Sequence, residues 1–344
     1  MAPAGSLRAG EIEMPPQGAR TIRIFLWTAI VALSVFPWVG DEFYVDFVVR
    51  LMILGIFAMS LDLLVGYTGL VSFGHAAFFG LSGYMLAIFT PEDSPVSLFW
   101  VLPACLAATG FAALVIGWIA VRTSGVYFIM ITLALAQMLY YFFNDSAYFG
   151  GSDGIFVAFR PVVGIGGYVL LDLENPHVFY YFVLGALVAS YLLLRTVLNA
   201  PFGHVLRAIK TDERRTRSLG FHTQRYKLAC FVIAGVVAGL AGFLEASHGG
   251  IISPAHLGWH ESGLILMTVI LGGMGTLYGS VIGAFALGFL QDFLQDTTQH
   301  WMLFLGIFIV TVVLLLPNGI AGIIRRITTG SPPVGDDLSE RKSK

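Results

Sequence analysis

The sequence predicts an all-α integral membrane protein, a polytopic helical bundle of about ten transmembrane helices with both termini in the cytoplasm. The first observation is composition: 57% of the residues are hydrophobic, 12% are charged, and the mean hydropathy is +0.81. The second is that apolar stretches near the roughly 20 residues needed to cross a bilayer recur along the chain. The third is the placement of Lys and Arg. A soluble domain of 344 residues would leave too much apolar surface uncovered, which excludes that class.

Ten apolar stretches are candidate membrane spans, although several are shorter than a full crossing. Two of them adjoin within residues 263–290, where the chain forms either one long helix or two helices joined at residues 272–275. The expected spans cover residues 24–39, 45–65, 70–89, 99–121, 126–143, 178–198, 228–246, 263–273, 277–290 and 301–316.

The positive charges decide between nine and ten spans, because cytoplasmic loops are enriched in Lys and Arg. With ten spans and a cytoplasmic N-terminus, all of the 19 Lys and Arg residues except Arg50 and Arg160 lie at the cytoplasmic side. Nine spans would move the pair Arg325 and Arg326 outside. We therefore expect ten spans, with 263–290 divided into two helices. The expected outer loops are acidic, and Glu261 is one of their carboxylates.

This topology divides the chain into a cytoplasmic tail at 1–23, a transmembrane domain at 24–323 and a second cytoplasmic tail at 324–344. A cytoplasmic loop at 199–227 interrupts the transmembrane domain. The net charge of -2 gives no basic surface for nucleic acid. The two cysteines lie in apolar runs, so neither a disulfide nor a metal site is expected. Nucleotide-binding and hydrolase motifs are absent, which argues against an enzyme. Uphill transport by this chain would need an ion gradient or a partner.

The loop at 199–227 holds seven of the 19 Lys and Arg residues. We expect two short helices there, at 201–210 and 212–219. Pro201 suits the first position of the first helix. Thr211 is the expected N-cap of the second, followed by Asp212 and Glu213 in its first turn. An ordinary basic loop would satisfy the membrane topology, but this pattern of caps specifies more structure and favours contact with a soluble partner.

Glycines are numerous, 40 in all, and many lie at the spacing that lets membrane helices approach closely. Two glycine-rich clusters, at 66–74 and 272–279, each break an apolar run. Interrupted spans in both halves of a chain are typical of a translocation path. The second half therefore suggests an inverted repeat of the first, although no residue-level repeat supports it. The glycines expected at helix contacts are Gly69, Gly74, Gly235, Gly239, Gly275, Gly279 and Gly283.

Ionisable groups within the expected spans are the third indication of a path. A charged side chain at a helix centre costs about 2.5–3.5 kcal/mol on insertion scales, so it usually faces the bundle interior or a wet cavity. Asp62, Ser72, His75 and Gln137 are the candidates for the path. For His75 and Gln137 a simple hydrogen bond between helices is the favoured interpretation over a role in binding a ligand. Glu245 lies close to the expected outer end of its helix, which lowers its cost.

Long motifs extend from about residue 45 to 320. They include Leu-Asp-Leu-Leu-Val-Gly-Tyr-Thr-Gly-Leu-Val-Ser-Phe-Gly-His-Ala-Ala-Phe-Phe-Gly at 61–80, Arg-Thr-Ser-Gly-Val-Tyr-Phe-Ile-Met-Ile-Thr-Leu-Ala-Leu-Ala-Gln-Met at 122–138 and Gly-Gly-Ser-Asp-Gly at 150–154. They continue with Gly-His-Val-Leu-Arg-Ala-Ile-Lys at 203–210, Glu-Arg-Arg-Thr-Arg-Ser-Leu-Gly at 213–220, Ile-Ser-Pro at 252–254 and Leu-Gly-Gly-Met-Gly-Thr-Leu-Tyr-Gly at 271–279. In these motifs the chain resembles the LivM-type permeases of branched-chain amino acid ABC importers. Two residues depart from the family pattern: Thr216 and Asp62.

The resemblance implies a multi-pass protein of the bacterial inner membrane that imports leucine, isoleucine and valine. Its partners would be membrane lipid, a second homologous permease, a periplasmic substrate-binding protein and two ATPase subunits. The ATPases would bind ATP and Mg, so no cofactor is expected in this chain. Alternatives are a permease for urea or short amides and an ion-coupled secondary transporter. The residues expected at the ATPase contact are Arg207, Thr211, Asp212, Glu213, Arg214, Arg215, Leu219 and Gly220.

Overall fold

The computed structural model describes residues 16–91, 95–165, 168–171, 173–316 and 319–323. The expected tail 324–344 lies outside these residues, as does the expected tail 1–23 up to residue 15. Residues 16–23, assigned to that tail from the sequence, instead form the start of helix α1. Seven helices of the described chain are long and apolar enough to cross a membrane. The protein is therefore a polytopic helical membrane protein.

The elements follow one another along the chain with short connections. The long helices are α1 (Pro16–Val35), α2 (Glu42–Thr68), α4 (Leu98–Ala120), α5 (Val126–Asn144), α6 (Pro176–Asn199), α9 (Thr223–Gly249), α11 (Leu277–Thr297) and α12 (Trp301–Leu315). The shorter ones are α3 (Ala76–Phe89), α7 (Pro201–Thr211), α8 (Glu213–Ser218), α10 (Trp259–Gly272) and the 3-10 helices η1 (Phe36–Trp38), η2 (Ala147–Phe149), η3 (Gly151–Asp153) and η4 (Pro254–Leu257). The strands are β1 (Ile155–Phe156), β2 (Val163–Ile165), β3 (Tyr168–Leu171) and β4 (Ile251–Ile252).

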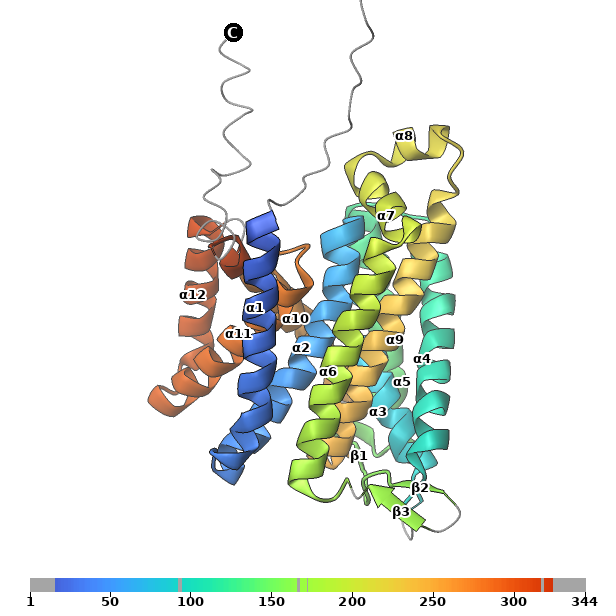
Figure 1. The fold of residues 1–344 in the computed structure, drawn as a ribbon. Helices are drawn as coiled ribbons and strands as arrows, with labels where there is room; N and C mark the ends of the chain where they lie inside the picture. The colour runs from blue at the N-terminus through green and yellow to red at the C-terminus, as the bar shows by residue number, and fades with distance from the viewer. Residues whose placement is uncertain (1–15, 92–94, 166–167, 172, 317–318, 324–344) are drawn as a thin grey trace, which may run out of the picture.

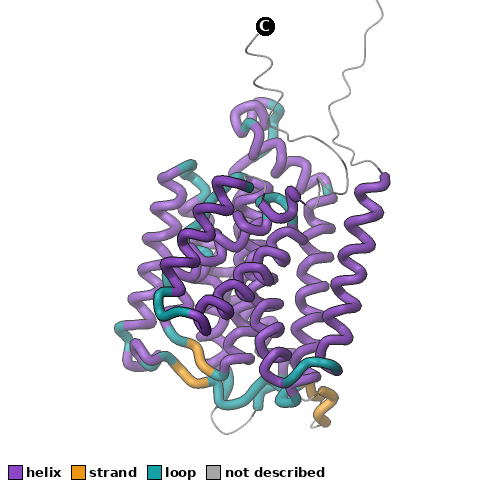
Figure 2. The backbone as a smooth tube through the Cα atoms, turned by 90° about the vertical axis from the view of Figure 1, so that its left-hand side faces the viewer, coloured by secondary structure: helices purple, strands orange, loops and turns teal. Residues whose placement is uncertain are grey.

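The two ends of the bundle differ in character (Figure 1). Helices α7 and α8 project from one end, here named the α8 side. The short strands lie at the other end, here named the β side, where β1 pairs antiparallel with β4 and β2 with β3. The helices between them run roughly along one axis, which Figure 2 shows from a second direction.

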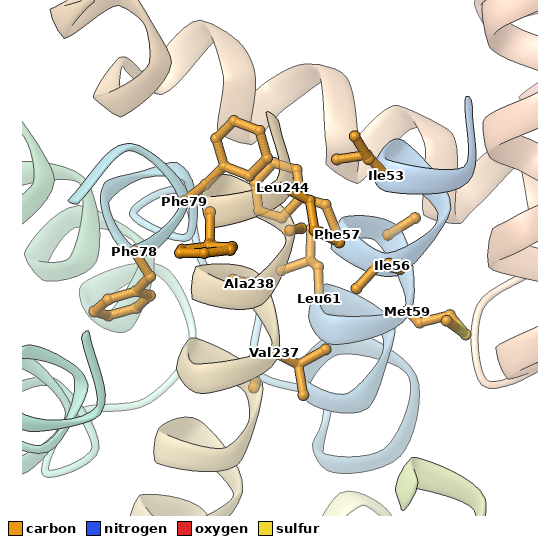
Figure 3. Packing of buried hydrophobic residues seen from close by; sticks show 14 of the residues in the cluster. Ile53, Ile56, Phe57, Met59, Leu61, Phe78, Phe79, Val237, Ala238 and Leu244 are labelled. Carbon is orange, nitrogen blue, oxygen red and sulfur yellow. The ribbon is translucent and has the colours of Figure 1, made fainter. Parts of the chain in front are cut away.

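Helices α2 and α9 form the centre of the bundle. They pack against each other, and α9 also packs on α3 and α4. In the most apolar 18-residue stretch of α2, 89% of the residues are buried, whereas in the corresponding stretches of α4 and α5 only 22% are buried. An apolar helix that remains uncovered in this way is stable only against lipid or another membrane protein. Figure 3 shows the central contact, where Phe57 and Leu61 of α2 meet Phe79 of α3 and Leu244 of α9.

Helices α3 and α10 are half-helices: α3 follows the non-helical residues 69–75, and α10 follows the short 3-10 helix η4. Both contain 14 residues, which corresponds to about 21 Å and is short of a bilayer core of roughly 30 Å. Their N-termini meet inside the bundle, where the amide of Ala76 donates to Ser262 Oγ at 3.0 Å. From this junction α3 runs toward the β side and α10 toward the α8 side. The expectation of one continuous span over 70–89 is wrong, because glycine-rich residues 69–75 are not helical.

The region 263–290 forms two helices, α10 and α11, separated at residues 273–276. Gly273 and Gly275 both have positive φ in this turn, which is backbone that other residues rarely adopt. Helix α10 begins earlier than expected, at Trp259. Glu261 is consequently in its first turn and not in an outer loop.

Candidate functional site

The charged segment on the α8 side folds into two short helices, as its caps indicate. Helix α7 extends through Thr211, so the assignment of Thr211 as the N-cap of the next helix is wrong. Asp212 is that N-cap, and its carboxylate accepts from the amide of Arg215 at 3.0 Å. Thr211 Oγ1 instead donates back to the carbonyl of Arg207 at 3.0 Å. Gly220 follows α8 with φ of 90°, the positive φ expected of a glycine after a helix end.

An ion-pair network holds α8 against the start of α9. Lys227 Nζ donates to Glu213 Oε2, and Thr223 Oγ1 donates to Glu213 Oε1 at 3.1 Å. Arg217 adds an exposed contact to the same carboxylate at 3.3 Å. Partial burial raises the pKa of Glu213, but the hydrogen bonds and charges of Lys227, Thr223 and Arg217 outweigh it and hold that pKa below its ordinary value. The Lys227 side chain is only 4% exposed, so this is the buried anchor of α8.

The outward face of α8 is basic and carries one bare apolar side chain. Arg214 and Arg215 are exposed, and Leu219 is 72% exposed. Thr216 faces the opposite way and is buried, with its hydroxyl donating to the carbonyl of Asp212 at 2.9 Å. An exposed apolar residue among arginines is the composition of a protein contact surface.

Helix α7 is tied to the end of α2 that faces it. Lys210 Nζ donates to the carbonyl of Gly66 at 2.6 Å, where a cation also complements the C-terminal end of the helix dipole. One turn earlier, Asp62 Oδ1 accepts from the amide of Gly275 at 2.7 Å and joins α2 to the α10–α11 turn. The positive charge of Lys210 also acts on Asp62. A Cβ on Gly66 would collide with the Gly275 backbone, so these segments touch directly.

Arg207 takes a different position. Its guanidinium donates to the carbonyl of Leu198 at 3.2 Å and lies 5.8 Å from the centre of the Tyr67 ring. It therefore contacts the ends of α6 and α2 and is not a free surface charge.

The remaining candidates for a path surround the junction of the half-helices. His75 is fully buried, its Nε2 lies 2.8 Å from Ser60 Oγ, and its ring stacks on Phe57 with centroids 5.8 Å apart. Ser72 Oγ accepts from the amide of Gly74 at 3.3 Å. Gln137, on α5, has a buried Nε2 without a hydrogen-bond partner among the described residues. The structure thus places His75 and Ser72 near one another and Gln137 on a neighbouring helix, while Asp62 lies at the α8 side.

The glycines expected at helix contacts all lie in the described part of the chain. Gly69 caps α2 with positive φ, and Gly275 has positive φ in the turn described above. At the others a Cβ would meet another segment: Thr132 for Gly74, Ala113 for Gly235, Thr109 for Gly239, Gly272 for Gly279 and Thr268 for Gly283.

Several of these contacts were not foreseen from the sequence. Ser60 and Ser262 carry no pattern that predicts their partners, which lie 15 and 186 residues away. Lys227 offered a weak signal, since a cation just inside an apolar helix needs an anion, and Glu213 was available in the preceding helix. No cluster of three or more His, Cys, Asp or Glu residues suited to a metal occurs among the residues that the structure describes.

The helices, half-helices and projecting α7–α8 unit define a multi-pass helical membrane protein, and comparison with known proteins identifies its class. The model of the family "Branched-chain amino acid transport system / permease component" matches residues 43–313. The chain belongs to this family.

Two relatives resemble it over most of its length. The high-affinity branched-chain amino acid transport system permease protein LivM of Salmonella typhimurium is 27% identical over 322 residues, 88% of this chain and 76% of the relative. LivM of Escherichia coli K12 matches to the same extent. The ribose import permease protein RbsC of Haemophilus influenzae is 27% identical over 138 residues, 38% of this chain and 42% of that protein. No solved structure matches the chain.

Proposed function

We propose that this chain is the permease subunit of an ATP-driven importer of branched-chain amino acids in a bacterial inner membrane. It would form the translocation path with a second homologous permease, receive substrate from a periplasmic binding protein and contact two ATPase subunits. The observation that carries this proposal is the α7–α8 unit, whose exposed arginines and Leu219 project from a membrane bundle that holds no nucleotide motif of its own. The similarity to LivM over 88% of the chain supports the substrate class.

The ties around α7 and α8 support a coupling role for this unit. Helix α8 is bound to α9 through Glu213 and Lys227, and α7 is bound to α2 through Lys210. Because α2 and α9 are the two central helices, a displacement of α8 by a partner would be transmitted to the central helices and not to the peripheral ones. ATP and Mg would remain on the partner ATPases, so the chain itself would be non-catalytic.

The proposed topology has ten membrane-inserted helices and an inverted repeat, with the α8 side and both termini in the cytoplasm. Helices α1 to α5 form one set, and α6 with α9 to α12 form the other. The opposite directions of the half-helices α3 and α10 support this division. Single cysteines at Ser218 and Ser152 test it, because the native Cys105 and Cys230 are buried. An impermeant thiol reagent added outside should label only the Ser152→Cys variant, and labelling of Ser218→Cys would reverse the orientation.

The function is tested by co-purification and uptake. A tagged chain isolated from its host in mild detergent should bring with it a second permease and two ATPases. The assembly in proteoliposomes, with its binding protein, should take up leucine, isoleucine and valine only when ATP is present. Purification of the chain alone, with uptake that continues without ATP and is abolished by an uncoupler, would instead establish an ion-coupled transporter. Uptake of urea and not leucine would identify the short-amide branch.

The coupling surface is tested by reversing its charge. Arg214→Glu combined with Arg215→Glu should abolish uptake while leaving membrane insertion intact, because both side chains are exposed and form no hydrogen bond or ion pair with the described residues. Gly220→Pro should do the same, since proline cannot adopt the positive φ found there. Arg122→Glu, at another exposed arginine on the α8 side, is the charge-reversal control, although it also removes the contact of that guanidinium with the Trp118 ring at 3.9 Å. Normal uptake by the double variant would contradict the coupling role.

A further inference from the structure

A cavity in the β-side half of the bundle matches the three chemical groups of an aliphatic amino acid. We propose that this cavity binds a zwitterionic α-amino acid: Arg50 would hold the carboxylate, Glu245 and Glu261 the ammonium, and an aromatic wall the side chain. The proposal deepens the proposed function, on which it rests, by naming where this chain meets its substrate.

The cavity lies between five segments of the chain and below the β-side ends of the helices. It measures about 280 Å³ and is lined from α2, α9, the η4–α10 segment and α11, with Phe79 of α3 as a fifth contribution. Arg50 is eight residues from the start of α2, and Glu245 is four residues from the end of α9. At 1.5 Å per residue these positions lie roughly 12 Å and 6 Å inside the bundle. The volume is near the lower end of about 300–1,000 Å³ that is usual for small-molecule sites.

The charged side chains at this cavity make no direct contact with one another among the described residues, although His256, which also lines it, and Arg50 act electrostatically on Glu245. The three ion pairs found among the described residues lie elsewhere, at Glu213 with Arg217 and Lys227 and at His248 with Asp46. Neither Arg50 nor Glu245 nor Glu261 has a hydrogen bond or ion pair in the described chain, although all three line the same cavity. Glu245 and Glu261 are partly buried and Arg50 is exposed. In a membrane such charges are costly and are normally paired with one another. Opposite charges on three separate elements that face one space without closing on each other leave room for a ligand between them.

The arrangement of signs fits a zwitterion. The Arg50 guanidinium offers a planar fork of N–H donors, which binds a carboxylate through two parallel hydrogen bonds. Glu245 and Glu261 offer acceptors for the three N–H donors of an ammonium group. Asp292 of α11 also lines the cavity, so its carboxylates outnumber its one arginine by three to one, which disfavours a free anion as the ligand. Urea and simple amides carry neither charge and would leave all three groups unpaired.

The apolar wall fits a branched aliphatic side chain. Phe57 and Phe79 line the cavity with their rings stacked 4.6 Å apart, and Leu54 lies beside them. Both rings are buried and in the central cluster, so the wall is rigid. The Phe57 ring also stacks on the His75 ring, which places the aromatic wall next to the junction of the half-helices. A ligand released inward from this cavity would therefore meet the interrupted helices next.

The test uses the whole importer in proteoliposomes and measures leucine uptake and ATP hydrolysis together. Arg50→Gln and Glu245→Gln should each lower leucine uptake roughly tenfold or more at subsaturating leucine, because each removes a charged hydrogen-bond partner. Arg50→Lys keeps the charge but loses the fork and should fall between Arg50→Gln and wild type. Asp296→Asn removes an exposed carboxylate at the same end of α11 and should not change uptake. Co-elution of each variant with both ATPases shows that it has folded.

The outcomes separate the site from the function. If the wild-type importer carries leucine and both Arg50→Gln and Glu245→Gln carry it within about twofold of wild type, the site is wrong and the proposed function stands. If the wild type carries urea and no amino acid, both are wrong. A loss of leucine uptake that matches across Arg50→Gln, Glu245→Gln and Asp296→Asn also overturns the site, because the effect would then follow any loss of charge.

Discussion

The anchor of α8 makes an asymmetric prediction about two residues that touch each other. Lys227 is nearly buried, at 4% exposure, whereas the Glu213 side chain is 28% exposed. Changing Glu213→Gln leaves a buried ammonium without its anion. Changing Lys227→Met removes the ammonium together with its need for a partner, and Glu213 can then turn to water while keeping Thr223 and Arg217. We therefore expect Glu213→Gln to be the more destabilising substitution.

The size of the effect follows from these exposures. Removing one partner of a fully buried ion pair costs about 3–5 kcal/mol, and an exposed pair contributes roughly 0–1 kcal/mol. Glu213 lies between these limits, and a glutamine still accepts a hydrogen bond there. The expected loss in free energy of unfolding is about 1.5–3 kcal/mol for Glu213→Gln, the range of a hydrogen bond to a charged group. For Lys227→Met we expect less than about 1 kcal/mol.

The assay is detergent unfolding of the purified chain, measured for wild type, both single variants and the double variant. The double variant should resemble Lys227→Met, because Glu213 has little left to stabilise once the ammonium is gone. The same proteins, assembled with ATPases, should show that Glu213→Gln hydrolyses ATP with less uptake per ATP. The reverse ranking of the single variants, or a Glu213→Gln protein within about 0.5 kcal/mol of wild type, would refute this account of the anchor.

Three further predictions concern the same contacts. Folding lowers the pKa of Glu213, so its ionised carboxylate stabilises the protein at any pH above the ordinary glutamate pKa. This stabilisation is lost as the pH falls through the lowered pKa of the folded protein. The difference in unfolding free energy between wild type and Glu213→Gln should therefore be constant from pH 7 to 5 and narrow below about pH 4. Gly66→Ala should lower the unfolding free energy by about 1–3 kcal/mol, because the new Cβ would meet the Gly275 backbone. Gly185→Ala is the control and should not destabilise the protein, because no atom lies within 4 Å of the new Cβ. Equal stability of the two variants would contradict the close approach of Gly66 and Gly275. Ser262→Ala should destabilise the protein by about 1–3 kcal/mol by leaving the Ala76 amide unpaired, and an unchanged detergent-unfolding midpoint would show that water replaces the hydroxyl.

Composition and local signals predicted much of the architecture. The class of fold, the break between α10 and α11 and the two helices of the charged loop follow from hydropathy, glycine clusters and caps, which act over a few residues. The N-cap was misassigned by one residue because Thr211 and Asp212 are both good caps, and only the course of the chain decides which one leaves the helix. The glycine cluster at 66–74 indicated an interruption near α3, but the bounds of the expected span, 70–89, are wrong because hydropathy does not distinguish a buried non-helical segment from a helix.

The contacts that build the candidate site lay beyond the sequence for a different reason. Asp62 with Gly275 and Ala76 with Ser262 are separated by 213 and 186 residues. Nothing local marks these partners, and their pairing follows only from the opposite directions of the two half-helices. The cavity residues show the same limit: Arg50 was recognised as one of two cations outside the cytoplasmic set, and Glu245 as an inexpensive charge near a helix end. Only the fold brings them to one space.

Helix α2 connects these features, and its stiffness gives the connection physical meaning. It contacts α7 and the α10–α11 turn at one end through Gly66 and Asp62, the junction of the half-helices through Ser60, and the cavity through Arg50. A helix of 27 residues is about 40 Å long, and α2 contains no proline to bend it. A sideways displacement of its Gly66 end must therefore be accompanied by displacement elsewhere along its length, because the helix tilts or shifts as one body. In the proposed importer, Lys210 delivers the motion of the coupling unit to that end, so the position of Arg50 relative to Glu245 on α9 depends on the state of the ATPases. A substrate held between two central helices would then be released when those helices move relative to each other, without any residue of the coupling unit approaching it.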